Sequence, residues 1–220
     1  MKGLLLAMTE PLPEHEEEFD AWYDTEHLPE RRSIPGFISA RRWVAEESCD
    51  LAVAPERRLG RFLATYELEH PEVLETPAYL KHVGDGCTPW TKRCLGRAAV
   101  FRRWACEQIN PGDLLPPAQS RAVFLASGDV PAQHEAEFNR WYDEEHVPML
   151  RQVDGVLAAR RFRARTGTPR YLALYDLADE LVPESLAWRA AIETAWSRRI
   201  DELTQDREWI LRTYLSYHPS

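Results

Sequence analysis

Cysteines and long apolar runs are scarce in this sequence, and their scarcity excludes several classes of protein. The four cysteines among 220 residues match no paired zinc-ligand spacing and are too few for a disulfide framework, so we expect free thiols. The longest clean apolar stretch, residues 3–8, is far shorter than the roughly 18 residues that span a bilayer. Thr9 and Glu10 end it too early for a signal peptide. We therefore expect a protein of the reducing cytoplasm with no membrane partner.

The chain also lacks an excess of basic residues and the motifs of several enzyme classes. Its 27 Lys and Arg against 36 Asp and Glu give a formal net charge of −9 at pH 7, which argues against nucleic acid or an anionic membrane as a partner. No glycine-rich phosphate loop, Walker pattern or nucleophile elbow occurs. The hydrophobic share of 44%, with 8 Trp, 8 Tyr and 7 Phe, instead predicts a globular chain with a sizeable core.

The sequence contains two copies of one pattern. Residues 15–29 recur at 134–148, and at this constant offset of 119 the two copies are identical at 15 of the 28 positions from 15 to 42. A later segment, residues 61–68, recurs at 170–177 with an offset of 109. The first copy therefore carries about ten additional residues between the two segments.

Two domains are predicted from this repeat. The additional residues fall within 46–58, a polar stretch that we expect to form a long hairpin loop. Between the copies, residues 109–119 have the proline and glycine content of a linker. We predict a first domain at 1–108 and a second at 120–220.

Each copy predicts the same succession of elements. In the first copy, strands are expected at 3–8, 37–44, 61–68 and 98–105, with the repeated motif on a helix after the first strand and a second helix beginning near Pro71. This βαββαβ order is that of the split βαβ unit. One such unit leaves a face of its sheet bare, and a second unit packed back to back would bury it.

Three segments of the motif resemble a known superfamily. They are Trp-Tyr-Asp-Thr-Glu-His-Leu-Pro at 22–29, Ile-Pro-Gly-Phe at 34–37 and Ala-Arg-Arg at 40–42. With these residues the chain resembles the dimeric α+β barrel superfamily, and within it the EthD-like branch and its small relatives in aromatic degradation and prodigiosin-type pathways. The resemblance extends over both copies, and so over nearly the whole chain.

The resemblance implies an α+β fold in which two tandem ferredoxin-like βαββαβ units form an intramolecular pseudo-dimeric α+β barrel. Each unit would keep a pocket between its sheet and its helices. The superfamily includes antibiotic-biosynthesis monooxygenases, polyketide cyclases, muconolactone isomerases and heme-binding enzymes, so the fold does not choose among reactions. Met149-Leu150 replaces Glu30-Arg31 and Asp154 replaces Pro35, so we expect the second pocket to differ in its lining or to be the less active one.

The helical motif predicts an acid/base site. Tyr23 and Asp24, at i−4 and i−3, are within reach of His27, whose imidazole titrates near a reference pKa of about 6.5. A carboxylate on one ring nitrogen would leave the other for a substrate proton. Helix C-terminal carbonyls favour imidazolium, so an acid role is as consistent as a basic one, and Pro29 predicts that the helix bends or stops beside the histidine. The matching catalytic candidates of the second copy are Tyr142, Asp143 and His146.

Further candidates would contact the substrate, and each has a structural alternative. The aromatic residues could simply pack helix on sheet, the histidines could hold a kink, and the acidic residues could pair locally. Adjacent arginines on a strand point to opposite faces, so one of each Arg-Arg pair points inward, toward a carboxylate of the motif or an anionic substrate group. The candidates are Trp22 and Trp141, Glu26 and Glu145, Arg41 and Arg160, and Tyr66 and Tyr175.

No metal or other cofactor is expected. One acid and one imidazole per copy do not complete a metal site, and the cysteines are absent from the second copy. Heme ligation by His82 is a remote alternative, since Ala191 occupies the corresponding position of the second copy.

These residues predict a cofactor-free acid/base enzyme of the cyclase, isomerase, dehydratase or decarboxylase type, acting on a small aromatic or polyketide-like compound. A cofactor-independent monooxygenase of the same superfamily is the enzymatic alternative. A non-catalytic small-molecule carrier or accessory protein is the third. Further association of the chain into a homodimer is left open.

Overall fold

The computed structural model of the chain describes residues 1–46 and 58–218. The predicted hairpin loop within 46–58 lies almost entirely outside the described residues, as does Cys49. The other three cysteines, Cys87, Cys94 and Cys106, are free thiols, as the sequence predicts. No helix of the described part has the length and apolarity needed to cross a membrane.

The first copy forms the predicted succession with a more broken second helical region. Short helices separated by turns replace the helix expected from Pro71 onward, because Pro77, Gly84 and Pro89 interrupt that stretch. The last strand continues to Asn110, into the predicted linker. The elements are β1 (Gly3–Pro11), α1 (Glu16–Trp22), a π-helical turn (Tyr23–His27), α2 (Leu28–Ser33), β2 (Phe37–Val44), β3 (Phe62–Leu68), α3 (Pro77–Leu80), α4 (Pro89–Gly96) and β4 (Ala98–Asn110).

The second copy repeats this order with longer helices in its second part. Short 3₁₀ turns again precede the first helix and follow the third strand. The elements are β5 (Ala122–Gly128), α5 (Glu135–Trp141), a π-helical turn (Tyr142–His146), α6 (Val147–Leu150), β6 (Val156–Thr166), β7 (Tyr171–Leu177), α7 (Leu186–Ile192), α8 (Ala195–Thr204) and β8 (Ile210–Ser216).

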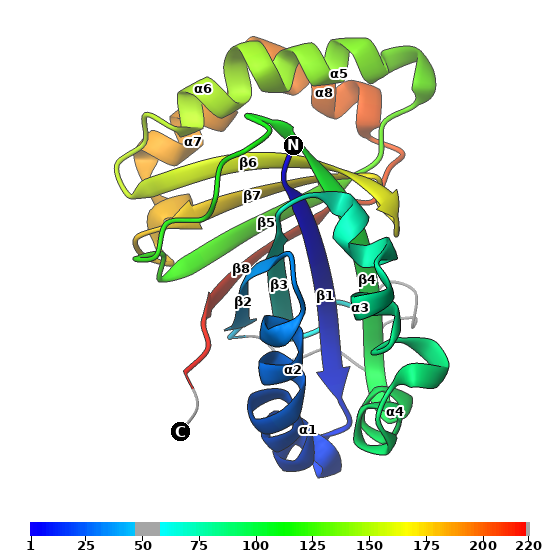
Figure 1. The fold of residues 1–220 in the computed structure, drawn as a ribbon. Helices are drawn as coiled ribbons and strands as arrows, with labels where there is room; N and C mark the ends of the chain where they lie inside the picture. The colour runs from blue at the N-terminus through cyan, green and yellow to red at the C-terminus, as the bar shows by residue number, and fades with distance from the viewer. Residues whose placement is uncertain (47–57, 219–220) are drawn as a thin grey trace.

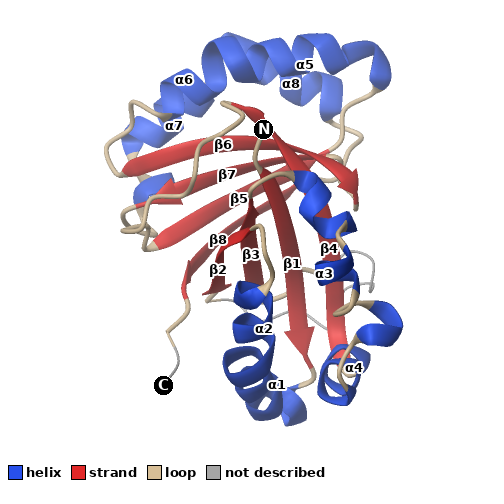
Figure 2. Cartoon of the chain, in the orientation of Figure 1, coloured by secondary structure: helices blue, strands red, loops and turns tan. Residues whose placement is uncertain are grey.

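The eight strands close into one antiparallel barrel in the order β1-β3-β2-β8-β5-β7-β6-β4. Each half contributes four neighbouring strands, and the halves meet where β2 pairs with β8 and where β4 pairs with β6. Helices α1 to α4 cover the outer face of one half and α5 to α8 that of the other (Figures 1 and 2). The predicted pseudo-dimeric barrel of two ferredoxin-like units is therefore confirmed.

Strand alternation separates two kinds of core. Along β1, Leu4, Leu6 and Met8 belong to the apolar core inside the barrel, which residues of both halves share. Leu5 and Ala7, between them, face the helices of their own half. Each half therefore has a sheet-to-helix layer of its own, and the functional candidates lie in these two layers.

The π-helical turns exclude one of the two effects predicted for Pro29, the end of the helix. The helix does not stop beside His27: the Leu28 N–H donates to the Tyr23 carbonyl, and α2 continues to Ser33. Pro29 has no N–H to donate, and the wider turn lets the chain pass this position without breaking the helical run. The second half repeats the arrangement around Pro148.

Candidate functional site

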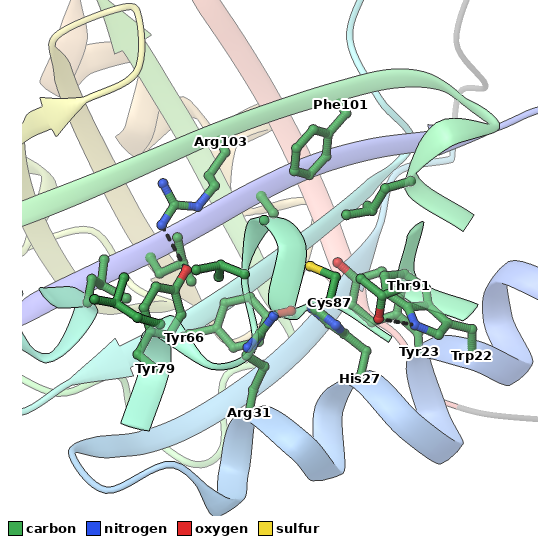
Figure 3. Close-up of a pocket in the computed structure, with 17 residues that line it drawn as sticks. Trp22, Tyr23, His27, Arg31, Tyr66, Tyr79, Cys87, Thr91, Phe101 and Arg103 are labelled. Atoms are coloured by element: carbon green, nitrogen blue, oxygen red, sulfur yellow. Dashed lines mark hydrogen bonds between the residues drawn. The ribbon is translucent and has the colours of Figure 1, made fainter. Parts of the chain in front are cut away.

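Each half encloses a hollow between its sheet and its helices. The hollow of the first half measures about 410 Å³ and that of the second about 350 Å³, sizes that accommodate a compound of a few fused rings. Figure 3 shows that the side chains of the first hollow converge from the motif helix, from the strands and from the segment around Cys87. Matching aromatic and imidazole groups line both hollows: Trp22, Tyr23, His27, Tyr66 and Tyr79 in the first, and Trp141, Tyr142, His146, Tyr175 and Trp188 in the second.

The two histidines occupy equivalent positions among aromatic rings. The His27 ring centroid lies 4.5 Å from that of Trp22, 5.1 Å from that of Tyr23 and 6.2 Å from that of Tyr66. The corresponding distances around His146 are 4.2, 5.0 and 6.4 Å. The repeated motif therefore builds the same aromatic enclosure twice.

Two matching pairs of buried polar atoms in these enclosures have no hydrogen-bond partner. They are Nδ1 of His27 and of His146 and the hydroxyl oxygens of Tyr66 and Tyr175. Buried polar atoms in proteins nearly always have a partner, because an unpaired one costs about 1–3 kcal/mol. These unpaired atoms occur at equivalent positions in the two enclosures.

Burial sets the protonation state of these groups. It lowers the pKa of His27 to about 3, with help from the positive charges of Arg31 and Arg42, and the pKa of His146 also to about 3, with help from Arg161. Burial raises the pKa of Tyr66 well above that of a free phenol. The resting histidines are therefore neutral, which corrects the expectation that an imidazolium acid is as consistent as a base.

The lowered histidine pKa values predict a loss of stability in acid. Each histidine has a folded-state pKa of about 3 against about 6.5 unfolded, so between these values the unfolded chain binds more protons. Stability should be greatest above pH 6.5 and fall toward pH 3, by about 1.4 kcal/mol per pH unit for each histidine. Urea unfolding of wild type and of the double variant His27→Gln/His146→Gln at several pH values measures this. An equally steep fall in both proteins would contradict it.

Asp24 and Asp143 do not orient the histidines. Arg42 donates to Asp24 at 3.1 Å and also to Asp20. Asp143 accepts from Arg161 at 3.1 Å and from the side-chain amide of Asn110 at 2.7 Å. The prediction assumed α-helical spacing, whereas the π-helical turn changes the angle between Asp24 and His27.

Arg41 and Arg160 do not line either hollow. Arg160 is buried and donates to Glu67 at 2.8 Å and to Asp176 at 3.1 Å, and Arg41 donates to the Pro117 carbonyl at 3.1 Å. Strand alternation sends these two arginines away from the helices, whereas the neighbouring Arg42 packs over Tyr23. Arg42 and Arg161 are therefore the members of each Arg-Arg pair that face the helices.

Glu26 and Glu145 bind helix caps. Thr88 donates to Glu26, and its hydroxyl also accepts the Thr91 N–H at 3.0 Å, so it caps α4. In the second half, Thr194 donates to Glu145, and its hydroxyl accepts the Ser197 N–H and so caps α8. Sequence reasoning missed these threonines, although Thr-x-x-Thr at 88–91 and Thr-x-x-Ser at 194–197 form a repeated capping signal.

His82, the remote candidate for heme ligation, is engaged elsewhere. Its Nδ1 lies 2.7 Å from Glu30, and the residue does not line the first hollow. Within residues 1–46 and 58–218, no group of three or more His, Cys, Asp or Glu side chains could hold a metal ion.

Sequence reasoning also missed three polar residues of the first hollow: Arg31, Tyr79 and Arg103. For Arg31 the sequence did hold a clue, because Leu150 occupies its position in the second copy and this difference predicted unlike linings. The structure confirms that difference. Tyr79 and Arg103 reach the hollow through α3 and β4, whose positions no local pattern reveals.

Solved structures share this architecture. No protein-family model and no curated protein matches the chain. An anthrone oxidase-like protein superposes over 99% of this chain and 91% of its own, with a TM-score of 0.60 and 13% identity. The chain has the dimeric α+β barrel fold. A candidate monooxygenase from Lactobacillus acidophilus NCFM (97% and 93% covered, TM-score 0.56, 9% identity) and a candidate chlorite dismutase (99% and 96%, 0.55, 10%) share the fold. Identities this low show the fold alone.

Proposed function

We propose that the chain is a cofactor-free enzyme that removes a proton from a small hydroxylated aromatic or polyketide-like compound held in these hollows. One observation carries the proposal. In each hollow, one histidine nitrogen and one tyrosine hydroxyl are buried without a hydrogen-bond partner. Unpaired buried polar atoms cost stability, and a ligand that paired with them would offset that cost.

The neutral histidine would accept the proton. The imidazole of His27 or His146 would take a proton from the acidic carbon or hydroxyl of the substrate, while the phenol of Tyr66 or Tyr175 would donate to the developing oxyanion. A histidine of low pKa is a weak base, so the transfer is uphill. Pairing of the new imidazolium with the substrate anion, in a hollow of low dielectric, would offset part of this cost.

Return of the proton at another atom would complete an isomerisation or cyclisation, and loss of a group from the anion would complete a dehydration or decarboxylation. All four reactions share proton removal as their first step. A lyase or isomerase of aromatic metabolism is the resulting description.

A monooxygenase is the second candidate, since the same carbanion can react with dioxygen. The largely apolar walls of both hollows suit dissolved oxygen. Two neighbours in the same fold are described as a candidate monooxygenase and as anthrone oxidase-like, which is an analogy of fold.

Anthrone, whose ring methylene is acidic, separates the candidates. In D2O under argon, we expect the purified chain to accelerate deuterium exchange at this carbon, which NMR measures. Under oxygen, enzyme-dependent oxygen uptake and an oxidised product would support the monooxygenase. Exchange no faster than in buffer, together with tight binding of anthrone, would contradict the proposal and support a carrier.

A further inference from the structure

Three of the differences between the two hollows concern a cationic or phenolic side chain of the first half. The offset of 119 aligns Arg31 with Leu150, and the offset of 109 aligns Tyr79 with Trp188. Sheet register gives the third pair: Arg103 lies opposite Ala7 on β1, and Leu211 lies opposite Ala126, the counterpart of Ala7 on β5. Two arginines and a tyrosine in the first half thus correspond to two leucines and a tryptophan in the second.

Arg31 brings a nearly desolvated guanidinium to the first hollow. The residue is 4% exposed, and its Nη2 donates to the His82 carbonyl at 3.0 Å. Its Nη1 has no hydrogen-bond partner; Glu30 forms an ion pair with it at 3.5 Å and also contacts His82. The guanidinium carbon lies 5.4 Å from the centre of the Tyr79 ring.

Arg103 approaches Tyr79 from the opposite end. Its Nη2 donates to the Tyr79 hydroxyl at 2.9 Å, and no carboxylate of the described residues forms an ion pair with it. Figure 3 shows Arg103 on β4 beside Phe101, which is 47% exposed and lines the same hollow. A half-buried cation without an acidic partner therefore faces the ligand space.

We propose that Arg31, Tyr79 and Arg103 form an anion-binding subsite, present in the first hollow alone, that takes the carboxylate of an aromatic acid. The planar guanidinium groups suit a carboxylate, since each can donate two parallel hydrogen bonds. The aromatic part of the ligand rests on the proposed function. The negative charge of the ligand does not, because it follows from the two arginines.

The lining of the second hollow disfavours the binding of an anion. Leu211 and Trp188 line it in place of Arg103 and Tyr79, and its lining includes no Lys or Arg among the described residues but does include the acidic residue Asp201. The chain should therefore bind one aromatic acid in the first hollow, whereas a neutral aromatic compound should enter both.

Calorimetric titration with 1-hydroxy-2-naphthoate and 1-naphthol tests this subsite, since the two probes share a ring system and differ by the carboxylate. We expect one naphthoate per chain and a naphthoate affinity that falls about ten- to a hundredfold in Arg103→Leu. The affinity for 1-naphthol should stay within about threefold, which also shows that the variant is folded. Arg31→Leu should act in the same direction.

Arg102→Leu is the matched control. Arg102 is the preceding residue of the same strand, but its guanidinium packs over Trp104 and donates to the Thr168 carbonyl, outside the hollow. This variant should bind both probes as wild type does. Equal loss of naphthoate affinity in Arg102→Leu and Arg103→Leu, or unchanged affinity in Arg103→Leu, would overturn the subsite while leaving the proposed function in place. Binding of neither probe would overturn both proposals.

Discussion

The double variant His27→Gln/His146→Gln is expected to lose nearly all acceleration of deuterium exchange in anthrone. A positioned general base typically contributes about 10²- to 10⁴-fold to a rate, and glutamine cannot accept the proton. Its side chain is polar and of similar size, so we expect 1-naphthol to bind with nearly unchanged affinity. NMR exchange rates and calorimetric affinities, measured on the same preparations, separate loss of chemistry from loss of binding.

A second pair of repeated histidines provides the control. His15 and His134 are also related by the offset of 119, and neither lines the first or the second hollow. His15→Gln/His134→Gln should exchange anthrone at the wild-type rate. The single variants assign the activity to one or both hollows. An unchanged rate in the double variant of His27 and His146 would show that these histidines are not the base.

Sequence periodicity could predict which side of the motif helix faces the hollow. Trp22, Tyr23 and His27 lie on that side because apolar and aromatic residues recur at helical spacing. The repeat also predicts that the strand with Tyr66 belongs to the same half as this helix. The barrel also follows from the repeat, since each sheet has one face that its own helices leave uncovered, and the two sheets bury these faces against each other. These features depend on local pattern and on duplication, both of which the sequence displays.

Other features depend on geometry that no local pattern carries. The sequence could not decide between Arg41 and Arg42, because a shift of one residue in the strand exchanges their faces. It could not place Asp24, because the π-helical turn departs from α-helical spacing. Arg103 required the register of β4 against β1, which pairs residues about a hundred positions apart.

Duplication has not kept the two halves equal, and the barrel interior shows this as clearly as the hollows do. Arg160 bonds both Glu67 and Asp176, which are themselves counterparts in the two halves. Arg41, the counterpart of Arg160, bonds a backbone carbonyl instead. One arginine therefore bonds the acidic residues of both halves inside the barrel.

Arg160→Met is expected to destabilise the fold by about 3–5 kcal/mol at pH 7, because it strands two carboxylates in the barrel interior. Glu67 and Asp176 are each at most 1% exposed, and Glu67 Oε2 and Asp176 Oδ1 already lack partners. Burial raises the pKa of both carboxyls even with Arg160 present. Arg41→Met, at the matching position, should cost far less, and urea unfolding of the two variants measures the difference.

The pH dependence of this loss distinguishes stranded charge from lost packing. A carboxyl whose folded-state pKa is raised binds a proton more readily in the folded chain, so its destabilising effect disappears as the pH falls to its unfolded value near 4. The deficit of Arg160→Met relative to wild type should therefore shrink between pH 7 and pH 4. The triple variant Arg160→Met/Glu67→Gln/Asp176→Asn carries no buried charge at this cluster and should recover most of the loss at pH 7. A deficit that is constant with pH and persists in the triple variant would assign the effect to packing around Arg160 and Phe162 instead.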